Sequence, residues 1–425
     1  MDESSTTNHS QELEWVAHCF PPPPEWIFEP DIKSVKQAIE QIRPHPIIKL
    51  LAQDGFIKVY NVKTDQQCLT LRVARPTEHN YRTVSEVATI DWIRRSVTLP
   101  APRIVAYSTT PHNSTGFEWI LMDKIPGRPL SESWRAMTYP AKETLVRQFT
   151  THASITFRNK FHGIGNIYPE TPTSGGFTVG PIAFTAFFLA RQMQETTKGP
   201  FYSSKDWLLT ILRLAENPSA ITKFARRSDL QNSEQLELDG AESRLTIIKR
   251  LESLVWREFP DSTRIAESTM IFHQGLSLHN ILVDGDGTLV GVGNWDCASA
   301  LPAWKACSFP AFLEGPFRPE APDLSNYELD AESHYWDHLL EHEQTKLRQY
   351  YLDEMERLEP EWVEIFRSST FKRDIFIAIK SSNGDILEDC ITEWLDEVDN
   401  GNPIAPTLSE RIADHGLFIK LKKSV

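Results

Sequence analysis

The order of strand-like and helix-like segments is the feature that most constrains the fold of this chain. Runs of β-branched and aromatic residues predict five strands, at 47–51, 56–62, 68–74, 104–107 and 117–122. Helical periodicity predicts one helix between the third and fourth strands, at 83–96. Asp54-Gly55 is a turn signal, so the first two strands are expected to form a hairpin. The predicted unit is a small lobe, residues 45–123, built on a five-stranded antiparallel sheet with one helix.

After Pro126-Gly127 the pattern becomes mainly helical. A compact β-region is predicted at 270–292, between helices predicted at 142–160, 204–214, 241–259 and 335–358. Pro360 is expected to stop the last helix, whose apolar stripe begins at Trp336. Polar composition predicts exposed loops at 228–239 and 320–332. We therefore expect a larger, mainly helical lobe at 124–400 and a C-terminal tail at 401–425. The predicted fold class is α+β and bilobal, with the ligand site in the cleft between the lobes.

Residues 1–44 are expected to form an N-terminal extension. It contains a run of prolines at 21–24, which favours a stiff, extended backbone. Phe20 and Trp26 flank this run, and we expect these aromatic side chains to dock the extension on the body. A short helix is predicted near 34–42.

Charge and composition exclude some classes of partner. The formal net charge of −14 argues against non-specific binding to nucleic acid or to an anionic membrane. No apolar run is long enough to span a bilayer, and the first ten residues lack the apolar core of a secretory signal. The five cysteines are scattered, as is typical of reduced thiols inside the cell. We expect a cytoplasmic protein that binds neither nucleic acid nor membrane.

The segment His273-Gln-Gly-Leu-Ser-Leu-His-Asn280 is followed by a turn and then by Gly293-Asn294-Trp295-Asp296. This arrangement resembles the catalytic core of the aminoglycoside and choline phosphotransferase family, which shares its fold with protein kinases. In that family an Asp positions and deprotonates the acceptor hydroxyl, while an Asn and a second Asp hold magnesium on the ATP phosphates. The resemblance therefore implies ATP and Mg²⁺ as cofactors and a small-molecule hydroxyl compound as substrate.

Upstream segments follow the family order. By resemblance, Gly55 belongs to the nucleotide-loop hairpin, and Arg72 stands where a basic residue contacts the α and β phosphates. Glu86 matches the helix glutamate that pairs with this basic residue, and Met122 ends the strand whose backbone would face an adenine. The resemblance spans roughly residues 45–400, and segments 335–340 and 357–362 resemble those of a fungal branch of the family. One such motif is weak evidence, but several in the right order are strong evidence.

Two positions depart from the family pattern. Gly275 stands where the catalytic Asp belongs, and Asn294 stands where the metal-binding Asp belongs. The missing Asp at Gly275 removes a general base, which is worth about 10²- to 10⁴-fold in rate. The neutral Asn294 should hold magnesium more weakly than an Asp would. Both losses point to impaired phosphoryl transfer. The family pattern implies His273, Gly275 and Asn280 as the catalytic-loop positions, with His273 bracing the loop. It implies Asn280, Asn294 and Asp296 as the metal positions, although the family itself carries an acid at the place of Asp296.

Several residues also have plainer interpretations. Arg72 could be an outward-facing strand arginine, and Glu86 could close a capping box with Thr83 at a helix start. A zinc-protease pattern, His338-Leu-Leu-Glu-His342 with His334 one turn before it, is disfavoured because the same segment matches the family's C-terminal helix.

Two functions follow from the sequence. The first is a weak or altered ATP-dependent kinase of a small-molecule hydroxyl group. The second is a pseudokinase that kept the fold, lost the reaction, and acts by binding a ligand or a protein partner. Whether the chain is an enzyme depends on how far the changes at Gly275 and Asn294 lower the rate of phosphoryl transfer.

Overall fold

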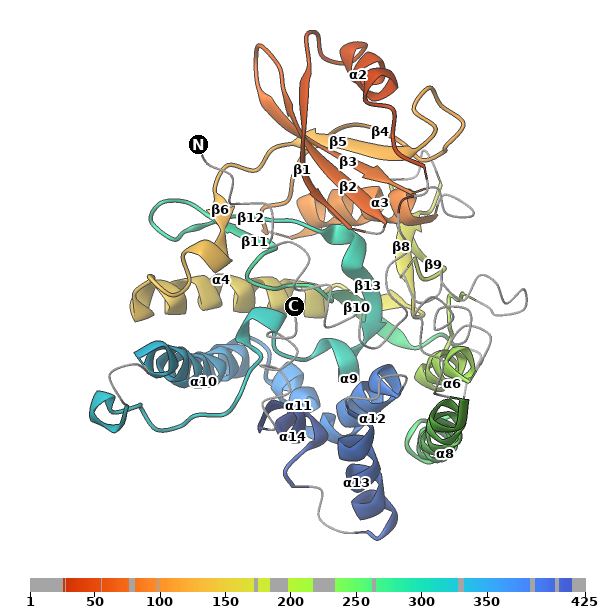
Figure 1. Cartoon of the computed structure of the whole chain (residues 1–425), viewed down its shortest axis with the longest axis vertical. Coiled ribbons are helices and arrows are strands. Elements are labelled where there is room, and N and C mark those ends of the chain that lie inside the picture. The colour runs from red at the N-terminus through yellow and green to blue at the C-terminus, as the bar shows by residue number, and fades with distance from the viewer. Residues whose placement is uncertain are drawn as a thin grey trace.

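The structure is a computed structural model, and its chain forms two lobes (Figure 1). It describes residue 26 and residues 28–54, 56–75, 81–97, 99–171, 175–183, 198–216, 234–261, 265–327, 332–382, 387–401 and 405–414. Gly55 and the proline run, both singled out in the sequence, lie outside the described residues.

The small lobe is an antiparallel sheet with strand order β1-β2-β3-β5-β4. Its strands are β1 (Ile47–Gln53), β2 (Ile57–Lys63), β3 (Cys68–Ala74), β4 (Ile104–Ser108) and β5 (Glu118–Asp123). Helix α3 (Tyr81–Ser96) lies between β3 and β4 in the sequence, so the predicted five strands and inserted helix are confirmed. The residues alternate along β3, and Leu69, Leu71 and Val73 pack on one face of the sheet with Val35 and Ile39 of α2 (Ile32–Glu40).

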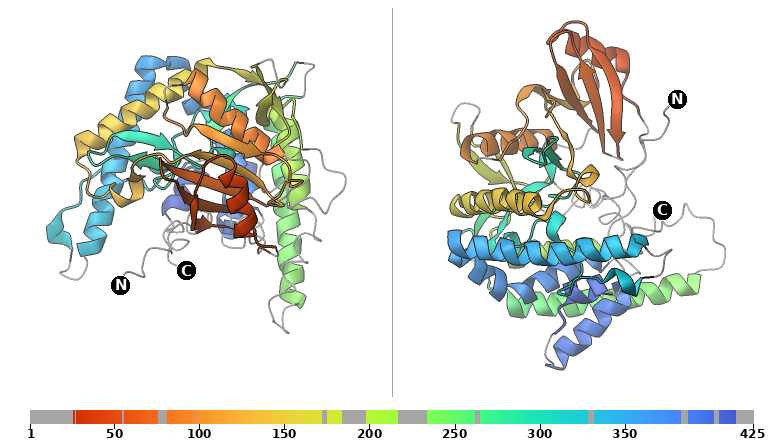
Figure 2. Two further views of the ribbon diagram at one scale, coloured as in Figure 1. Left: turned by 90° about the horizontal axis from the view of Figure 1, so that it is seen from above. Right: turned by 90° about the vertical axis from the view of Figure 1, so that its left-hand side faces the viewer.

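Helix α3 is shared between the lobes. It packs against β5 and β4 of the sheet and also against β8 and a short 3-10 helix, η4 (Trp295–Cys297), of the large lobe. Its residues Ile90, Trp92 and Ile93 belong to the main hydrophobic core, which extends through the large lobe. Helix α3 therefore lies at the junction of the two lobes (Figures 1 and 2).

The large lobe is mainly helical. Its helices are α4 (Tyr139–Arg158), α6 (Ser204–Ala215), α8 (Glu234–Glu258), α9 (Ala303–Ala306), α10 (Glu332–Leu358), α11 (Pro360–Ser368), α12 (Thr370–Ser381), α13 (Glu388–Asp399) and α14 (Leu408–Asp414). Short 3-10 helices are η2 (Leu130–Glu132), η5 (Ala311–Leu313) and η6 (Leu324–Asn326). With the sheet of the small lobe, these helices make the bilobal α+β fold that the sequence predicted.

Small sheets of the large lobe carry the catalytic-loop segment. Strand β10 (Ser268–His273) lies between β13 (Ala298–Pro302) and β7 (Phe161–His162), and β11 (Ile281–Val283) lies between β12 (Leu289–Val292) and β6 (Arg128–Pro129). A two-stranded sheet pairs β8 (Asn166–Pro169) with β9 (Phe177–Gly180). The segment between β10 and β11 is the predicted catalytic loop, and the segment between β12 and β13 contains η4.

Three sequence expectations need correction. Residues 234–239, predicted as loop, form the start of α8, because a polar composition alone does not prevent a helix. Thr83 lies inside α3, which begins at Tyr81, so it is not the N-terminal cap and the capping-box interpretation is wrong. Trp336 is 43% exposed and lies outside the apolar stripe of α10. The prediction for Pro360 is confirmed, because α10 ends at Leu358; the same proline also opens α11, since proline fits the first turn of a helix.

Trp26 packs on the small lobe, as predicted for it; Phe20, the other aromatic residue expected to dock the extension, lies outside the described residues. The Trp26 Nε1 group donates to the Asp54 carbonyl at 2.6 Å, and its ring centroid lies 5.8 Å from that of Phe117. Lys58 lies over the same ring and pairs with Glu29. Among the helices in the described residues, none combines the length and apolar character that a membrane span requires.

Candidate functional site

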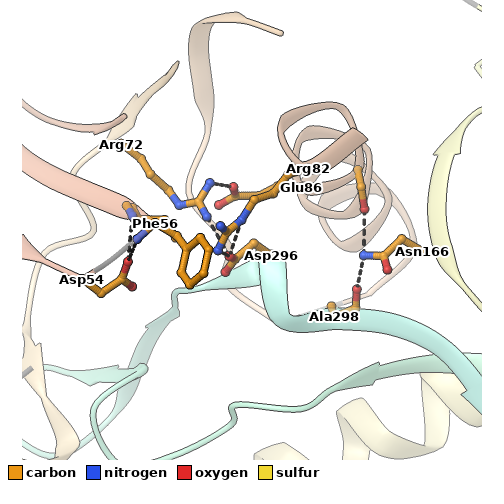
Figure 3. A network of polar contacts seen from close by, with 10 residues as sticks. Asp54, Phe56, Arg72, Arg82, Glu86, Asn166, Asp296 and Ala298 are labelled. Carbon is orange, nitrogen blue, oxygen red and sulfur yellow. Dashed lines mark hydrogen bonds and ion pairs between the residues drawn. The ribbon is translucent and has the colours of Figure 1, made fainter. Parts of the chain in front are cut away.

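Two buried arginines and two buried carboxylates meet at the junction of the lobes (Figure 3). Arg72 comes from β3, Arg82 and Glu86 come from α3, and Asp296 comes from η4. The Arg72 Nη2 atom lies 2.7 Å from Asp296 Oδ2, and the Arg82 Nη2 atom lies 2.6 Å from the same oxygen. Arg72 also pairs with Glu86, and the four side chains are between 3% and 9% exposed. This network joins the small lobe to the large lobe.

Local geometry explains why these side chains converge. Leu71 and Val73 face the core under α2, so the alternation along β3 turns Arg72 to the opposite face of the sheet. Arg82 and Glu86 are four residues apart on α3 and therefore share one face of the helix. The ion pair that the sequence predicted between Arg72 and Glu86 is present, and the interpretation of Arg72 as an outward-facing arginine is wrong.

The charges in this network affect one another. Burial raises the pKa of the Glu86 carboxyl above its usual range, and the neighbouring Arg72 guanidinium opposes this shift. The negative charge of Asp296 raises the pKa of Glu86 further, because two carboxylates in one buried site repel each other.

The catalytic loop keeps a defined shape around Gly275. The Gly275 amide donates to His273 Nδ1 at 3.2 Å, so the hydrogen of this imidazole is on Nε2, which donates to the Gly293 carbonyl at 3.0 Å. The Asn280 side-chain amide donates to the Gly275 carbonyl at 2.7 Å, and the Gly293 amide donates to the Asn280 carbonyl at 2.9 Å. Burial lowers the pKa of His273, which favours the neutral ring that this bonding needs. His273 thus braces the loop, as the family resemblance implied.

Asn294 has left-handed backbone angles, with φ of 62° and ψ of 47°. Asparagine adopts this conformation more readily than most residues, because its short polar side chain can bond locally. Its side chain is exposed, whereas that of Asp296, two residues later, is buried against the arginines. Two of the predicted metal positions therefore differ in exposure, because Asn294 faces solvent and Asp296 is enclosed by the arginines.

The turn between β1 and β2 lies beside the arginines. One Asp54 carboxylate oxygen accepts from the Phe56 amide at 2.6 Å and from the Ile57 amide at 2.7 Å. The Arg82 guanidinium lies 5.6 Å from the centre of the Phe56 ring. The hairpin is thus tied to the arginine network through Phe56 (Figure 3).

Met122 lies inside the sheet, where it is opposite Thr70 of β3 and Ile104 of β4. The amides of Asp123 and Lys124 bond to the backbone of the neighbouring segments as well. Strand β5 ends at Asp123, so the first backbone that follows the sheet is at Lys124 and beyond.

The described residues do not hold a metal site of the ordinary kind. They contain no group of three or more His, Cys, Asp or Glu side chains placed to bind an ion. The histidines of the zinc-protease pattern have separate contacts: His338 Nδ1 lies 2.6 Å from the Tyr327 hydroxyl, and His342 Nδ1 lies 3.1 Å from the Arg318 carbonyl.

The predicted magnesium ligands do not fit that ion either. One oxygen of Asp296 is held by two guanidinium groups, and Asn280, whose side-chain nitrogen donates to Gly275, could offer a metal ion only its amide oxygen. Asn280 and Asn294 supply only neutral oxygens, whereas Mg²⁺ sites beside phosphates normally use one or two carboxylates.

Sequence reasoning missed Arg82. Its partner Asp296 is 214 positions away in the chain, so no local pattern connects them. The only local signal was the spacing of four residues between Arg82 and Glu86, which places both on one helix face.

The chain matches a known protein family. The family model described as the phosphotransferase enzyme family matches residues 49–305. The chain belongs to this family. The match includes the sheet, α3, the catalytic loop and Asp296, and it confirms the resemblance seen in the motifs.

Individual relatives of this phosphotransferase family member are distant. A subtelomeric hrmA-associated cluster protein of Aspergillus fumigatus is 26% identical over 312 residues, which is 63% of this chain and 60% of that protein. This match therefore spans less than two thirds of the Aspergillus protein. Clavilactone A biosynthesis cluster protein Y of Ampulloclitocybe clavipes is 23% identical over 351 residues, or 80% of each chain. The crystal structure of aminoglycoside phosphotransferase APH(4)-Ia aligns over 93% of this chain and 100% of that one, with a TM-score of 0.45 and 11% identity.

Proposed function

We propose that this chain is a nucleotide-binding member of the phosphotransferase family whose transfer of phosphate to a small-molecule hydroxyl is impaired. The observation that carries the proposal is the intact catalytic loop around a residue that has no side chain. The loop is held by His273 and Asn280, but Gly275 offers no carboxylate to position or deprotonate an acceptor.

The nucleotide part of the proposal is supported by the arginine network. Arg72 and Glu86 form the strand-to-helix ion pair expected beside the phosphates of a bound nucleotide. An adenine would meet the backbone from Lys124 onwards, because Met122 is inside the sheet. His273 has the role of bracing the loop and does not act as a base in this proposal.

The proposal is tested with the native chain. Calorimetric titration with ADP and with ATP should show binding, and an assay of phosphate transfer to a panel of small hydroxyl compounds should show slow turnover. Fast turnover on any of these acceptors would overturn the impaired activity, and failure to bind either nucleotide under any condition would overturn the nucleotide site.

A pseudokinase that acts as a ligand-binding or scaffolding protein is the second candidate. One observation favours it: Asp296 already ties the lobes together through Arg72 and Arg82. A protein held in this way can present a fixed surface to a partner without a reaction. Complete absence of turnover together with retained nucleotide binding would favour this second function.

A further inference from the structure

One carboxylate oxygen receives two guanidinium groups at the junction of the lobes. Asp296 Oδ2 accepts from Arg72 Nη2 at 2.7 Å, from Arg82 Nη2 at 2.6 Å and from Arg82 Nε at 3.2 Å. Guanidinium groups bind carboxylate and phosphate oxygens with the same planar donor geometry. The two arginines thus form an anion site, and its occupant in this structure is the chain's own carboxylate.

The place of this site fits a phosphate chain. Arg82 lies over the Phe56 ring at the tip of the β1–β2 hairpin, and Arg72 comes from the neighbouring strand β3. Asp296 reaches the same point from the large lobe, so the oxygen lies between the lobes and beside the hairpin (Figure 3). A ligand beneath the hairpin would meet both guanidinium groups.

The same contacts are unfavourable for a divalent cation. A metal ion at Asp296 would have to approach an oxygen that already contacts two positive groups, and like charges at this distance in a buried site repel strongly. The other two candidate ligands, Asn280 and Asn294, carry no charge to offset this repulsion.

We propose that Arg72 and Arg82 bind the oligophosphate of a nucleotide directly, without a magnesium ion, and that Asp296 is the internal carboxylate that the phosphate displaces. This inference rests on the proposed nucleotide site and specifies how that site works. An oligophosphate carries several negative charges, so it competes well against the Asp296 carboxylate, while Glu86 stays paired with Arg72 and holds that guanidinium in place. Arg82 is a binding residue in this scheme, in addition to Arg72.

The test uses the full chain and calorimetric titration with tripolyphosphate and with ADP, each in EDTA and in excess magnesium. We expect binding of both in EDTA and no gain in affinity when magnesium is added. Binding that requires magnesium would overturn the inference while leaving the proposed function in place. If neither compound bound in either buffer, both would be overturned. ADP binding in EDTA together with normal phosphoryl transfer from ATP, measured in the separate acceptor assay, would overturn only the impaired activity.

Variants identify the groups involved. Asp296→Asn removes the internal competitor, so it should tighten tripolyphosphate binding in EDTA about tenfold. Arg82→Met should weaken the same binding at least tenfold. Arg82→Lys keeps the charge but loses the planar donor pair, so its affinity for tripolyphosphate should lie between those of the native chain and Arg82→Met. Glu341→Gln is the matched control, because Glu341 pairs with Arg318 at 2.9 Å within the large lobe and should leave binding unchanged. Weaker or equal binding by a folded Asp296→Asn protein would overturn the inference, and the magnesium comparison on the native chain decides it if that variant does not fold.

Discussion

At the scale of single residues, the proposed impairment of phosphoryl transfer is attributed to two positions. Gly275→Asp together with Asn294→Asp restores both family carboxylates in a loop that is still held by His273 and Asn280. Since a general base contributes about 10²- to 10⁴-fold, ATP turnover should rise at least about 100-fold in a steady-state assay with magnesium. Gly275→Asn with Asn294→Asp is the matched control and should not show this gain. Equal turnover in the two double variants would show that the missing base is not the cause.

A second prediction at this scale concerns His152 of α4. Burial and the nearby His273 lower the pKa of His152 to about 3, so the folded protein favours the neutral ring. The unfolded chain binds a proton near pH 6.5, and therefore the free energy of unfolding should fall as the pH drops below that value. Between pH 6.5 and pH 5, the titration of this group should lower the free energy of unfolding by roughly 2 kcal/mol. Urea unfolding across this range should show that the free energy of unfolding falls less with decreasing pH in His152→Gln than in the native chain. The control, His162→Gln at an exposed position, should show the same fall as the native chain.

At the scale of elements, the sequence predicted the sheet closely and the site only in part. Strand β3 matched its prediction because turn residues flank a clear run, and α3 was placed with a start two residues late. The start of α8 was missed because its residues are mostly polar. The pair Arg72–Glu86 could be predicted from the family order, whereas the contact of Arg82 with Asp296 depends on how the lobes pack. Local patterns contain no information on such long-range contacts.

The docked extension gives a prediction at the same scale. Trp26 bonds to the Asp54 carbonyl and packs on Phe117, so it supports the β1–β2 hairpin from outside. Trp26→Ala should lower the free energy of unfolding by about 1–3 kcal/mol, less than the about 3–5 kcal/mol for a fully buried large aromatic side chain. Trp26→Phe keeps a ring but loses the hydrogen bond, and should cost about 1 kcal/mol. Chemical denaturation measures both, and Phe28→Ala, at a residue that is 79% exposed, is the control. Equal midpoints for all three variants would contradict a supporting role for Trp26.

At the scale of the whole molecule, the two lobes are joined by polar contacts as well as by the shared core of α3. Asp296 connects to Arg72 and Arg82, and the Val292 amide donates to the Pro100 carbonyl at 2.9 Å. The segment between β10 and β11 and the β1–β2 hairpin therefore belong to one connected structure. A substitution at the junction should therefore lower the local stability of both lobes. In a protein whose lobes move independently, only one lobe would be affected.

Asn166 of β8 is the buried amide that tests this connection. Its Nδ2 group donates to Ser85 Oγ of α3 and to the Ala298 carbonyl of β13, both at 3.0 Å, and its Oδ1 accepts from the Ala183 amide at 2.9 Å. Removing it leaves several buried polar groups without their partner, at about 1–3 kcal/mol for each such group. Asn166→Ala should therefore lower the melting temperature by several degrees and speed hydrogen exchange in α3 and around η4 together. Asn159→Ala is the control, because Asn159 is exposed and its side chain donates to the Ile155 carbonyl at the end of its own helix. Faster exchange in one lobe alone would show that the lobes open independently.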